Sequence, residues 1–314
     1  MSDRPKVSVL MAVYNGLPYL QQALDCTLNQ TFKDFEFIIV NDASSDGTRE
    51  VLEEYASRDP RIRLLHNEAN LRQTASLNRG LAACRGEYLA RIDADDLCPL
   101  HKLERQVGVM EAHPSVIMSG TNHTMIDPEG KLIMHCTRPF TNEGMKWALF
   151  SICPVGGNGM VRMDAMREAG GYNEDVKLPQ DWDLCSRLFP KGLVIGIPEE
   201  LYYVRIHPGQ STVQGIERSR IEADGIVQRA TQSMFPKGSD QLRLTAARRR
   251  DMTAWQRWCR VRALYTLFKM NDPACDENDE FMNLVSTDRT NALTEIRKKY
   301  GKTVARLLGR TWKI

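Results

Sequence analysis

A short apolar stretch in this chain ends in three carboxylates within four positions: Glu87-Tyr88-Leu89-Ala90-Arg91-Ile92-Asp93-Ala94-Asp95-Asp96. Gly86 precedes the stretch, its side chains alternate, and Pro99 follows it, which predicts a buried strand leading into a helix. Crowded carboxylates repel one another unless a cation or a proton offsets their charge. Their oxygens are the ligands that Mg²⁺ and Mn²⁺ prefer, and these metals keep positions for water and phosphate. The stretch therefore predicts a metal site that bridges to a diphosphate, with a solvated acidic turn as the alternative.

Strands and helices alternate along the first 97 residues. We expect strands at 7–13, 35–42, 62–65 and 87–92, and helices that begin near Pro18, include residues 51–55 and span residues 73–83. This alternation is typical of a parallel sheet whose ligands bind at the carboxyl ends of the strands. Neither a Gly-x-Gly-x-x-Gly fingerprint nor a Walker lysine loop follows the first strand, which argues against a dehydrogenase and a P-loop NTPase.

The pattern changes after residue 97. Residues 124–134 predict an antiparallel hairpin, and we expect further strands at 116–120, 160–162, 193–197 and 201–204 and helices at 99–113, 141–150 and from Gln180. Beyond about Thr212 only helical patterns remain, and the most evident one spans residues 245–270. The predicted fold class is α/β with a mixed central sheet. It comprises a Rossmann-like nucleotide-binding half (1–97), an acceptor half (98–212) and an α-helical C-terminal region (213–314).

The composition is that of a globular protein, with 314 residues, 42% hydrophobic and 26% charged. No apolar stretch approaches the roughly 20 residues that span a bilayer, and the first residues lack the apolar segment of a signal peptide. We therefore expect a cytoplasmic protein. The eight cysteines include no Cys-x-x-Cys pair, which argues against a zinc ribbon and a disulfide framework.

Charge is distributed unevenly along the chain. Residues 216–314 carry 20 lysines and arginines against 12 acidic residues, whereas residues 1–215 carry 22 against 28. The basic run Arg248-Arg249-Arg250 precedes Trp255, Trp258 and Phe268, a combination that suits peripheral contact with an anionic membrane at its inner face. The alternative is that these aromatic side chains pack on the catalytic domain.

Four motifs occur in order along the chain. They are Ala12-Val13-Tyr14-Asn15-Gly16, Asn41-Asp42-Ala43-Ser44-Ser45-Asp46-Gly47-Thr48, Asp93-Ala94-Asp95-Asp96, and Gly170-Gly171-Tyr172 followed by Asp181. The set closely resembles family 2 glycosyltransferases of the GT-A fold over roughly residues 6–212. The resemblance implies a nucleotide-sugar donor, here expected to be a UDP-sugar, a divalent metal (Mn²⁺ or Mg²⁺), and inverting transfer of one sugar to an acceptor hydroxyl.

The resemblance also implies a role for individual residues. Asp95, with Asp93 and His207, would hold the metal, and Asp181 would be the general base; Ala12, Tyr14, Asp42, Arg72 and Asp93 would bind the nucleotide. Asp96 is a further metal candidate, and Asp46 either orients the nucleotide or caps the next helix. Each role has a structural alternative: a helix N-terminal acid for Asp181, a solvated loop arginine for Arg72 and a satisfied structural histidine for His207.

Two departures from the family pattern matter. Gln180 stands where the family commonly has Glu before the catalytic Asp, which puts the acceptor class in doubt. The Gln-x-x-Arg-Trp motif and membrane helices of processive members are missing, which predicts a non-processive enzyme. We expect a glycan or lipid-linked acceptor in cell-surface polysaccharide, lipopolysaccharide or glycoconjugate synthesis, and no nucleic acid partner.

Two other functions remain open. A sugar-phosphate nucleotidyltransferase would need a glycine-rich basic loop after the first strand, which Tyr14-Asn15-Gly16-Leu17 does not provide. A catalytically silent nucleotide-sugar or glycan-binding module would keep the fold and lose the base around Gln180.

Overall fold

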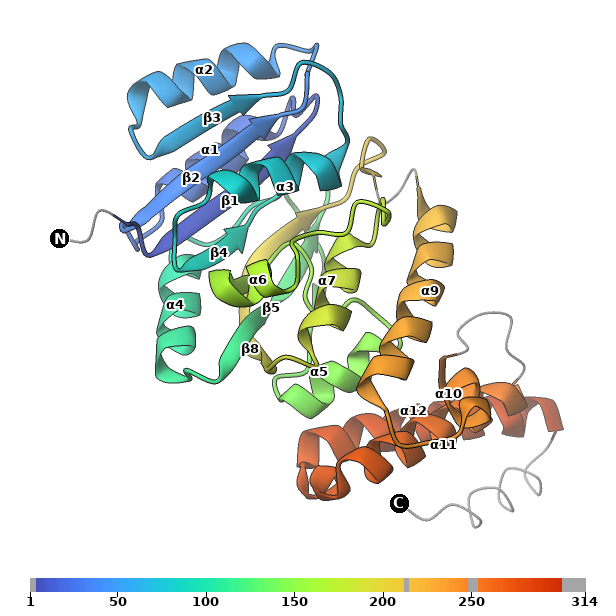
Figure 1. Cartoon of the computed structure of the whole chain (residues 1–314). Helices are drawn as coiled ribbons and strands as arrows, with labels where there is room; N and C mark the ends of the chain where they lie inside the picture. The colour runs from blue at the N-terminus through green and yellow to red at the C-terminus, as the bar shows by residue number, and fades with distance from the viewer. Residues whose placement is uncertain (1–3, 212–214, 248–253, 301–314) are drawn as a thin grey trace.

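The computed structural model describes residues 4–211, 215–247 and 254–300, which form a mixed sheet covered by helices and followed by a helical region (Figure 1). The strands lie in the order β3-β2-β1-β4-β7-β5-β6, with β8 paired to β5. Four of them are parallel: β1 (Val7–Val13), β2 (Phe35–Asn41), β3 (Ile62–His66) and β4 (Tyr88–Arg91). Their connecting helices are α1 (Leu20–Leu28), α2 (Thr48–Arg58) and α3 (Gln73–Ala83). The predicted parallel half is confirmed.

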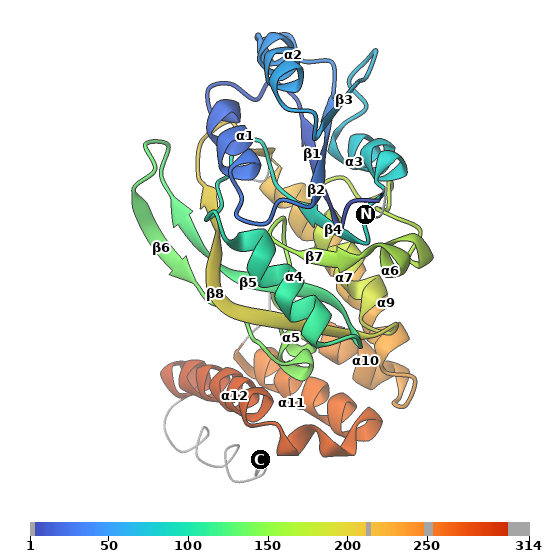
Figure 2. The same cartoon turned by 90° about the vertical axis from the view of Figure 1, so that its left-hand side faces the viewer.

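The core has two layers, one on each face of the sheet. Val9 and Met11 of β1 point into a cluster with α1, α2 and α4 (Lys102–Ala112), whereas Leu10 points into a second cluster with α3. Figure 2 shows α1 and α3 on opposite sides of β1 and β2. Both faces are buried, which explains why these strands are nearly continuous apolar runs.

The second half of the sheet is mixed, as expected. Strand β7 (Met160–Arg162) runs antiparallel to β4 and to β5 (Val116–Ile126), and β5 pairs antiparallel with β6 (Leu132–Cys136). The helices of this half are α5 (Asn142–Leu149), α6 (Met163–Glu168) and α7 (Gln180–Leu188). The hairpin turn is closed by a bond of 3.0 Å from the Gly130 N–H to the Asp127 carbonyl. The two strands expected at 193–197 and 201–204 are one strand, β8 (Leu193–Arg205), whose pairing with β5 shifts register between them.

The described part of the C-terminal region is helical. Its α-helices are α9 (Ile216–Met234), α10 (Asp240–Ala247), α11 (Ala254–Asn271) and α12 (Asp279–Tyr300), with a 3₁₀ turn at Pro273–Glu277. The prediction of one helix over 245–270 is wrong, because α10 and α11 pack against each other and so cannot be segments of one straight helix. The expected boundary after residue 212 falls at 212–214, outside the described residues.

The C-terminal helices pack against the rest of the chain. The Phe268 ring lies 5.6 Å from that of Trp147, 4.9 Å from that of Phe235 and 5.1 Å from that of Phe281, and it is buried. Glu280 of α12 accepts bonds of 2.7 Å from the backbone N–H groups of Phe140 and Thr141, next to α5. The packing alternative is therefore confirmed for Phe268.

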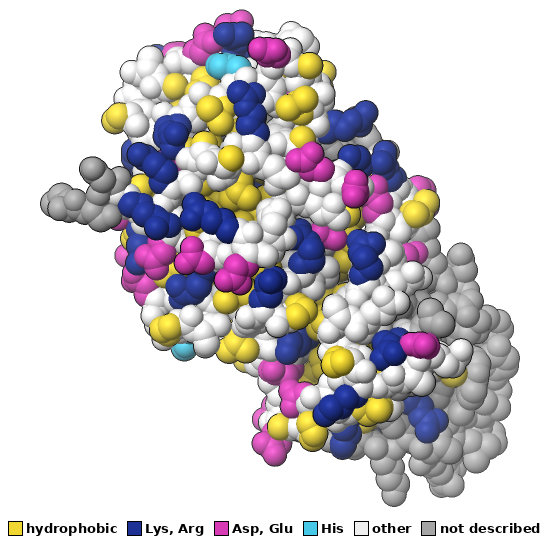
Figure 3. Space-filling model, in the orientation of Figure 1, with side chains coloured by type: hydrophobic (Ala, Val, Ile, Leu, Met, Phe, Trp, Pro, Cys, Tyr) yellow, Lys and Arg dark blue, Asp and Glu magenta, His cyan; other side chains and the backbone are white. Residues whose placement is uncertain are grey.

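The membrane alternative is not tested for the remaining residues it involves. Arg248–Arg250 and the side chains of Trp255 and Trp258 lie outside the described part of the chain. In the described residues no helix combines the length and the hydropathy needed to cross a bilayer. On the face shown in Figure 3, lysine and arginine side chains are interspersed with acidic ones.

Candidate active site

The loops after β1 and β2 hold each other at the carboxyl edge of the sheet. The Gly16 N–H donates to the Thr48 hydroxyl (2.8 Å), and the Leu17 and Thr48 N–H groups donate to the Asp46 carboxylate (3.2 and 3.1 Å). Burial opposes ionisation of Asp46, but these hydrogen bonds outweigh it and lower its pKa. Asp46 thus accepts from the N–H of Thr48, the first residue of α2, although the N-cap position itself is Gly47. A contact of Asp46 with the nucleotide stays a prediction.

Asp42 stands immediately after β2 and is almost fully buried, with 2% of its surface exposed. Its carboxylate accepts bonds of 2.8 Å from the Leu71 and Arg72 N–H groups and one of 2.6 Å from the Asn67 amide. Asp42 thus orders the loop before α3, in addition to its predicted contact with the nucleotide.

The other predicted nucleotide residues lie at the same edge. Tyr14, just beyond β1, is half exposed, so its ring is free to lie against a planar ligand, and Ala12 is a partly buried residue of β1 itself. Arg72 has a positive φ of 71° at the start of α3, which turns its backbone N–H toward Asp42 while its side chain is exposed. Their contacts with a nucleotide stay predictions.

Asp95 and His207 come together although 112 residues separate them. The Asp95 Oδ2 and His207 Nε2 atoms are 3.0 Å apart, and the His207 ring lies against Tyr19. Burial raises the pKa of Asp95, and the nearby negative charge of Asp93 raises it further, partly offset by His207. Asp96 is buried instead, and its Oδ1 accepts a bond of 2.9 Å from the Arg205 N–H.

Asp93, Asp95 and His207 fit a metal ion that is also coordinated by a bound substrate. No three His, Cys, Asp or Glu side chains within the described ranges already converge as a complete metal cluster. Mg²⁺ is nevertheless often held by one or two carboxylates, with water and substrate phosphate filling the other positions. Asp95 has an accessible carboxylate close to the charge of Asp93, and a cation there would offset that charge.

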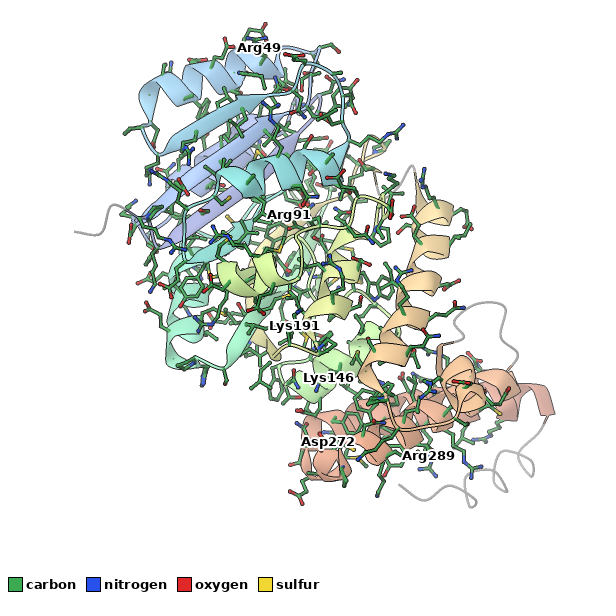
Figure 4. The ribbon with its side chains drawn as sticks, viewed as in Figure 1. Arg49, Arg91, Lys146, Lys191, Asp272 and Arg289 are labelled. Atoms are coloured by element: carbon green, nitrogen blue, oxygen red, sulfur yellow. The ribbon has the colours of Figure 1, made fainter. Side chains whose placement is uncertain are left out.

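The predicted base, Asp181, belongs to an ion-pair cluster around the buried Arg91. Nη1 of Arg91 donates to both carboxylate oxygens of Asp181 (2.6 and 2.7 Å), and Nη2 donates to Oδ1 of Asp93 (2.6 Å). Figure 4 shows Arg91 at the centre of the molecule, between the N-terminal half and α6 and α7. Burial raises the pKa of Asp181, and Arg91 only partly offsets this shift. A carboxyl group with a raised pKa is a better proton acceptor than an ordinary surface carboxylate.

Two glutamines extend this cluster. Gln73 at the start of α3 donates to Oδ1 of Asp93 (3.3 Å) and accepts from the Gln180 amide (3.1 Å). Gln180, the departure from the family pattern, is thus buried beside the predicted base, and its own Oε1 has no partner among the described residues. On the other side of Asp93 lies Gly157, where an added Cβ would be 2.8 Å from Oδ2 of that carboxylate.

Asp183, the other acid in the first turn of α7, is held away from this cluster. Its side chain is buried, and it forms ion pairs with Arg187 (2.7 Å) and Arg229 (3.3 Å). Arg187 also donates to the backbone carbonyls of Ala169 and Gly171. Asp183 therefore fixes α7 against its neighbours, which leaves Asp181 as the acid of this turn beside Asp93.

The structure brings Asp95 into contact with His207, and it joins Asp93 to Asp181 through Arg91. Sequence reasoning did not anticipate the contacts of Arg91 and Gln73. The position of Arg91 in an apolar strand could have indicated its ion pairs. A charged residue inside an otherwise apolar strand is buried and so requires a partner of opposite charge. The alternation of the strand suggested only which face it occupies.

Comparison with known proteins places the chain in a family. The sequence model of Glycosyl transferase family 2 matches residues 8–170. EpsE of Bacillus subtilis, which is named as a glycosyltransferase, is 34% identical over 209 residues, covering 65% of this chain and 74% of EpsE. An uncharacterized glycosyltransferase of Methanocaldococcus jannaschii is 32% identical, covering 63% of this chain and 69% of that protein.

Two solved structures share the fold. TarS 1-349 of S. aureus, solved with UDP-GlcNAc, has a TM-score of 0.64 at 14% identity and covers 95% of this chain and 92% of that one. The mannosyltransferase PcManGT of Pyrobaculum calidifontis, solved with GDP-Man and Mn²⁺, has a TM-score of 0.58 at 18% identity, covering 99% and 88%. TarS has the GT-A fold, in which a parallel half of the sheet continues into a mixed half, and the sheet of this chain has the same organisation. The chain therefore belongs to glycosyl transferase family 2 and is a glycosyltransferase of the GT-A fold.

Proposed function

We propose that this glycosyltransferase moves one sugar from a UDP-sugar to an acceptor hydroxyl with inversion at the anomeric carbon, aided by Mn²⁺ or Mg²⁺. The observation that carries the proposal is the link through Arg91 between Asp93, at the donor edge, and Asp181, at the start of α7. A base and an anion-binding edge held side by side suit the displacement of a diphosphate by a hydroxyl.

The donor would lie across the loops that follow β1, β2 and β4. Tyr14 would pack on the uracil ring, and the Asp42 carboxylate would accept a hydrogen bond from the N–H of that ring. Arg72 would approach the phosphates from the start of α3. Asp95, Asp93 and His207 would hold the metal, which supplies Lewis-acid stabilisation of the charge on the departing diphosphate. The complexes of TarS with UDP-GlcNAc and of PcManGT with GDP-Man and Mn²⁺ support a nucleotide-sugar donor and a divalent metal.

Asp181 would take the proton from the acceptor hydroxyl as that oxygen attacks. Both of its oxygens already accept from Arg91, and each keeps a second lone pair for the hydroxyl. Inversion requires a single displacement, so this base has to lie opposite the diphosphate. The fixed position of Asp181 relative to Asp93 supports that arrangement.

The acceptor would approach beside the segment that leads into α7. A hollow of about 370 Å³ lies there between that segment and α9, and its lining combines charged, amide and aliphatic groups: Asn173, Asp175, Val176, Ile221, Glu222, Gly225 and Arg229. Such a lining suits a sugar, which offers hydroxyls and an apolar ring face. We propose a glycan or lipid-linked acceptor of cell-surface polysaccharide, lipopolysaccharide or glycoconjugate synthesis.

The site of action would be the cytoplasmic face of the membrane. Peripheral contact would involve the basic run Arg248–Arg250, because each basic residue near an anionic surface adds roughly 1 kcal/mol of attraction. Co-sedimentation with anionic vesicles should then occur at low salt and decline at high salt. Equal sedimentation with neutral and anionic vesicles would refute this part of the proposal.

The experiment for the proposed function is hydrolysis of UDP-glucose, UDP-galactose and UDP-GlcNAc, with and without Mn²⁺, by the wild type and by Asp181→Asn. At least one donor should be cleaved in a Mn²⁺-dependent way, and the variant should bind UDP normally while its rate falls by about 10²-fold or more. A wild type that binds UDP with Mn²⁺ but turns over no donor would favour a silent binding module. A variant with a normal rate would remove Asp181 as the base.

A further inference from the structure

Arg91 is costly to bury where it lies. It is a β4 residue with 5% of its surface exposed, and its Nε has no partner among the described residues. An apolar side chain at such a position is often as stabilising as a buried ion pair, or more so. The stability of the strand therefore does not explain why an arginine occupies this position. Its two carboxylate partners explain it better.

The two partners belong to different sides of the proposed reaction. Asp93 follows β4 at the donor edge, and Asp181 lies 88 positions later in the first turn of α7. The chain between them includes β5, β6, β7 and α6, so no short covalent path fixes their separation. The guanidinium group joins them directly, with three bonds of 2.6 to 2.7 Å.

The surroundings of Arg91 restrict its movement. Lys102 of α4 donates to the Arg91 carbonyl (3.2 Å), Tyr172 packs beside the guanidinium, and the Asp93 N–H donates to the Tyr202 hydroxyl (3.0 Å). Both tyrosines are buried. A planar group held in this way presents its N–H donors in fixed directions, which a flexible ammonium group cannot do.

We propose that Arg91 is a positioning residue for sugar transfer: one guanidinium sets the Asp181 carboxylate on the acceptor side relative to Asp93 on the donor side. The inference rests on the proposed function. Arg91 touches neither the sugar nor the hydroxyl, and it acts by keeping the base aligned with the reacting carbon. A displacement of about 1 Å in such a group costs on the order of 10²-fold in rate.

The test compares Arg91→Lys, which keeps the charge but loses the planar fork, with Arg91→Met, which keeps only the length. Arg162→Lys is the matched control. Arg162 is a β7 arginine that binds the backbone carbonyls of Met110 and Val116, and its carboxylate partner is Glu87 instead of Asp93 or Asp181. For each variant we would measure kcat and KM for UDP-sugar hydrolysis with Mn²⁺, UDP affinity by calorimetry, and thermal unfolding.

Both Arg91 variants should lose about 10²-fold in kcat, while KM and UDP affinity change by about tenfold at most, because Gln73 still donates to Asp93 in these variants. The control should retain its kcat. In a third variant, Arg91→Ala, added guanidinium should partly restore the hydrolysis rate, whereas it should not restore the rate of Asp181→Asn. An Arg91→Lys variant within threefold of the wild-type kcat would overturn the inference. Parallel loss of folding, UDP affinity and rate in all Arg91 variants would also overturn it, because it indicates a purely structural role. A wild type without any turnover would instead refute the proposed function.

Discussion

Gly157 lies so close to Asp93 that a single methyl group there should disturb the proposed donor site. An added Cβ would be 2.8 Å from Oδ2 of Asp93, and that carboxylate cannot easily move because Arg91 and Gln73 hold its other oxygen. We predict that Gly157→Ala weakens Mn²⁺-dependent UDP binding by roughly tenfold, equivalent to about 1.4 kcal/mol. Calorimetric titration of UDP at fixed Mn²⁺ measures this change.

The neighbouring glycine provides the control for this prediction. A Cβ on Gly156 would meet nothing within 4 Å, so Gly156→Ala should bind UDP as the wild type does. Equal affinities for the two alanine variants would show that Asp93 does not take part in nucleotide binding, or that its carboxylate is free to move.

The sequence singles out the candidate carboxylates, but it does not show which side chains hold them in place. Asp93 and Asp95 stand out because acidic residues directly follow an apolar strand, and Asp181 stands out because it begins a helix after a Gly-Gly-Tyr motif. The link between them depends on the direction of the Arg91 side chain and on Gln73, which contacts Gln180 across 107 positions. Side-chain directions of this kind follow from packing and cannot be read from spacing.

Strand β2 contains a buried glutamate, Glu36, whose ionised side chain stabilises the neighbouring elements. Glu36 accepts from Ser8 (2.7 Å) and from the Arg85 backbone and side chain (2.7 and 3.0 Å), and it forms an ion pair with Arg63. Burial alone would raise the pKa of Glu36, but these bonds outweigh it and lower the pKa. The cluster lies near the start of β1 and β2, at the end opposite the carboxyl edge.

We predict that Glu36→Gln lowers the free energy of unfolding at pH 7 by roughly 1.5–3 kcal/mol, as expected for hydrogen bonds to a charged group. Because the folded pKa lies below the unfolded value of about 4.3, this stabilisation is present above that value and is lost as pH falls through the folded pKa. Urea unfolding of both proteins from pH 7 down to about pH 3 should show the difference shrinking. A pH-independent difference would contradict the prediction, and the exposed Glu53→Gln should have little effect at any pH.

The bounds of a helix or strand could be predicted from the sequence where its local apolar pattern agrees with its environment in the fold. Strands β1 and β7 and helix α3 have the expected bounds, because an apolar run or stripe coincides with a fully covered position. The predicted break in β8 fails because Pro198 and its polar neighbours are accommodated by a shift in register against β5. The predicted single helix over 245–270 fails because α10 and α11 pack against each other, and apolar periodicity does not reveal such a contact.

For the whole molecule, the aromatic cluster around Phe268 joins the C-terminal helices to the catalytic body. Phe268 contacts Trp147 and Phe150, which lie in α5 and directly after it, and Phe281 of α12. We predict that Phe268→Ala lowers the free energy of unfolding by about 3–5 kcal/mol, the usual cost of truncating a buried phenylalanine. Calorimetry should show one transition at a lower temperature, because both regions share this core.

Met270 on the same helix supplies the comparison, since its side chain is exposed. Met270→Ala should unfold at nearly the wild-type temperature. If Phe268→Ala instead shows two transitions, with the catalytic body unchanged, the C-terminal helices would be an independent unit and not part of one core.

The proposed mechanism requires a nucleoside diphosphate and a divalent metal to bind together at the carboxyl edge of β4. Calorimetric titration of UDP into the wild type and into Asp95→Ala, each with Mn²⁺ and with EDTA, measures this joint binding. We predict that Mn²⁺ strengthens UDP binding to the wild type, that Asp95→Ala loses this gain, and that both proteins unfold at similar temperatures. Unchanged Mn²⁺-dependent affinity in a folded Asp95→Ala variant would contradict the account.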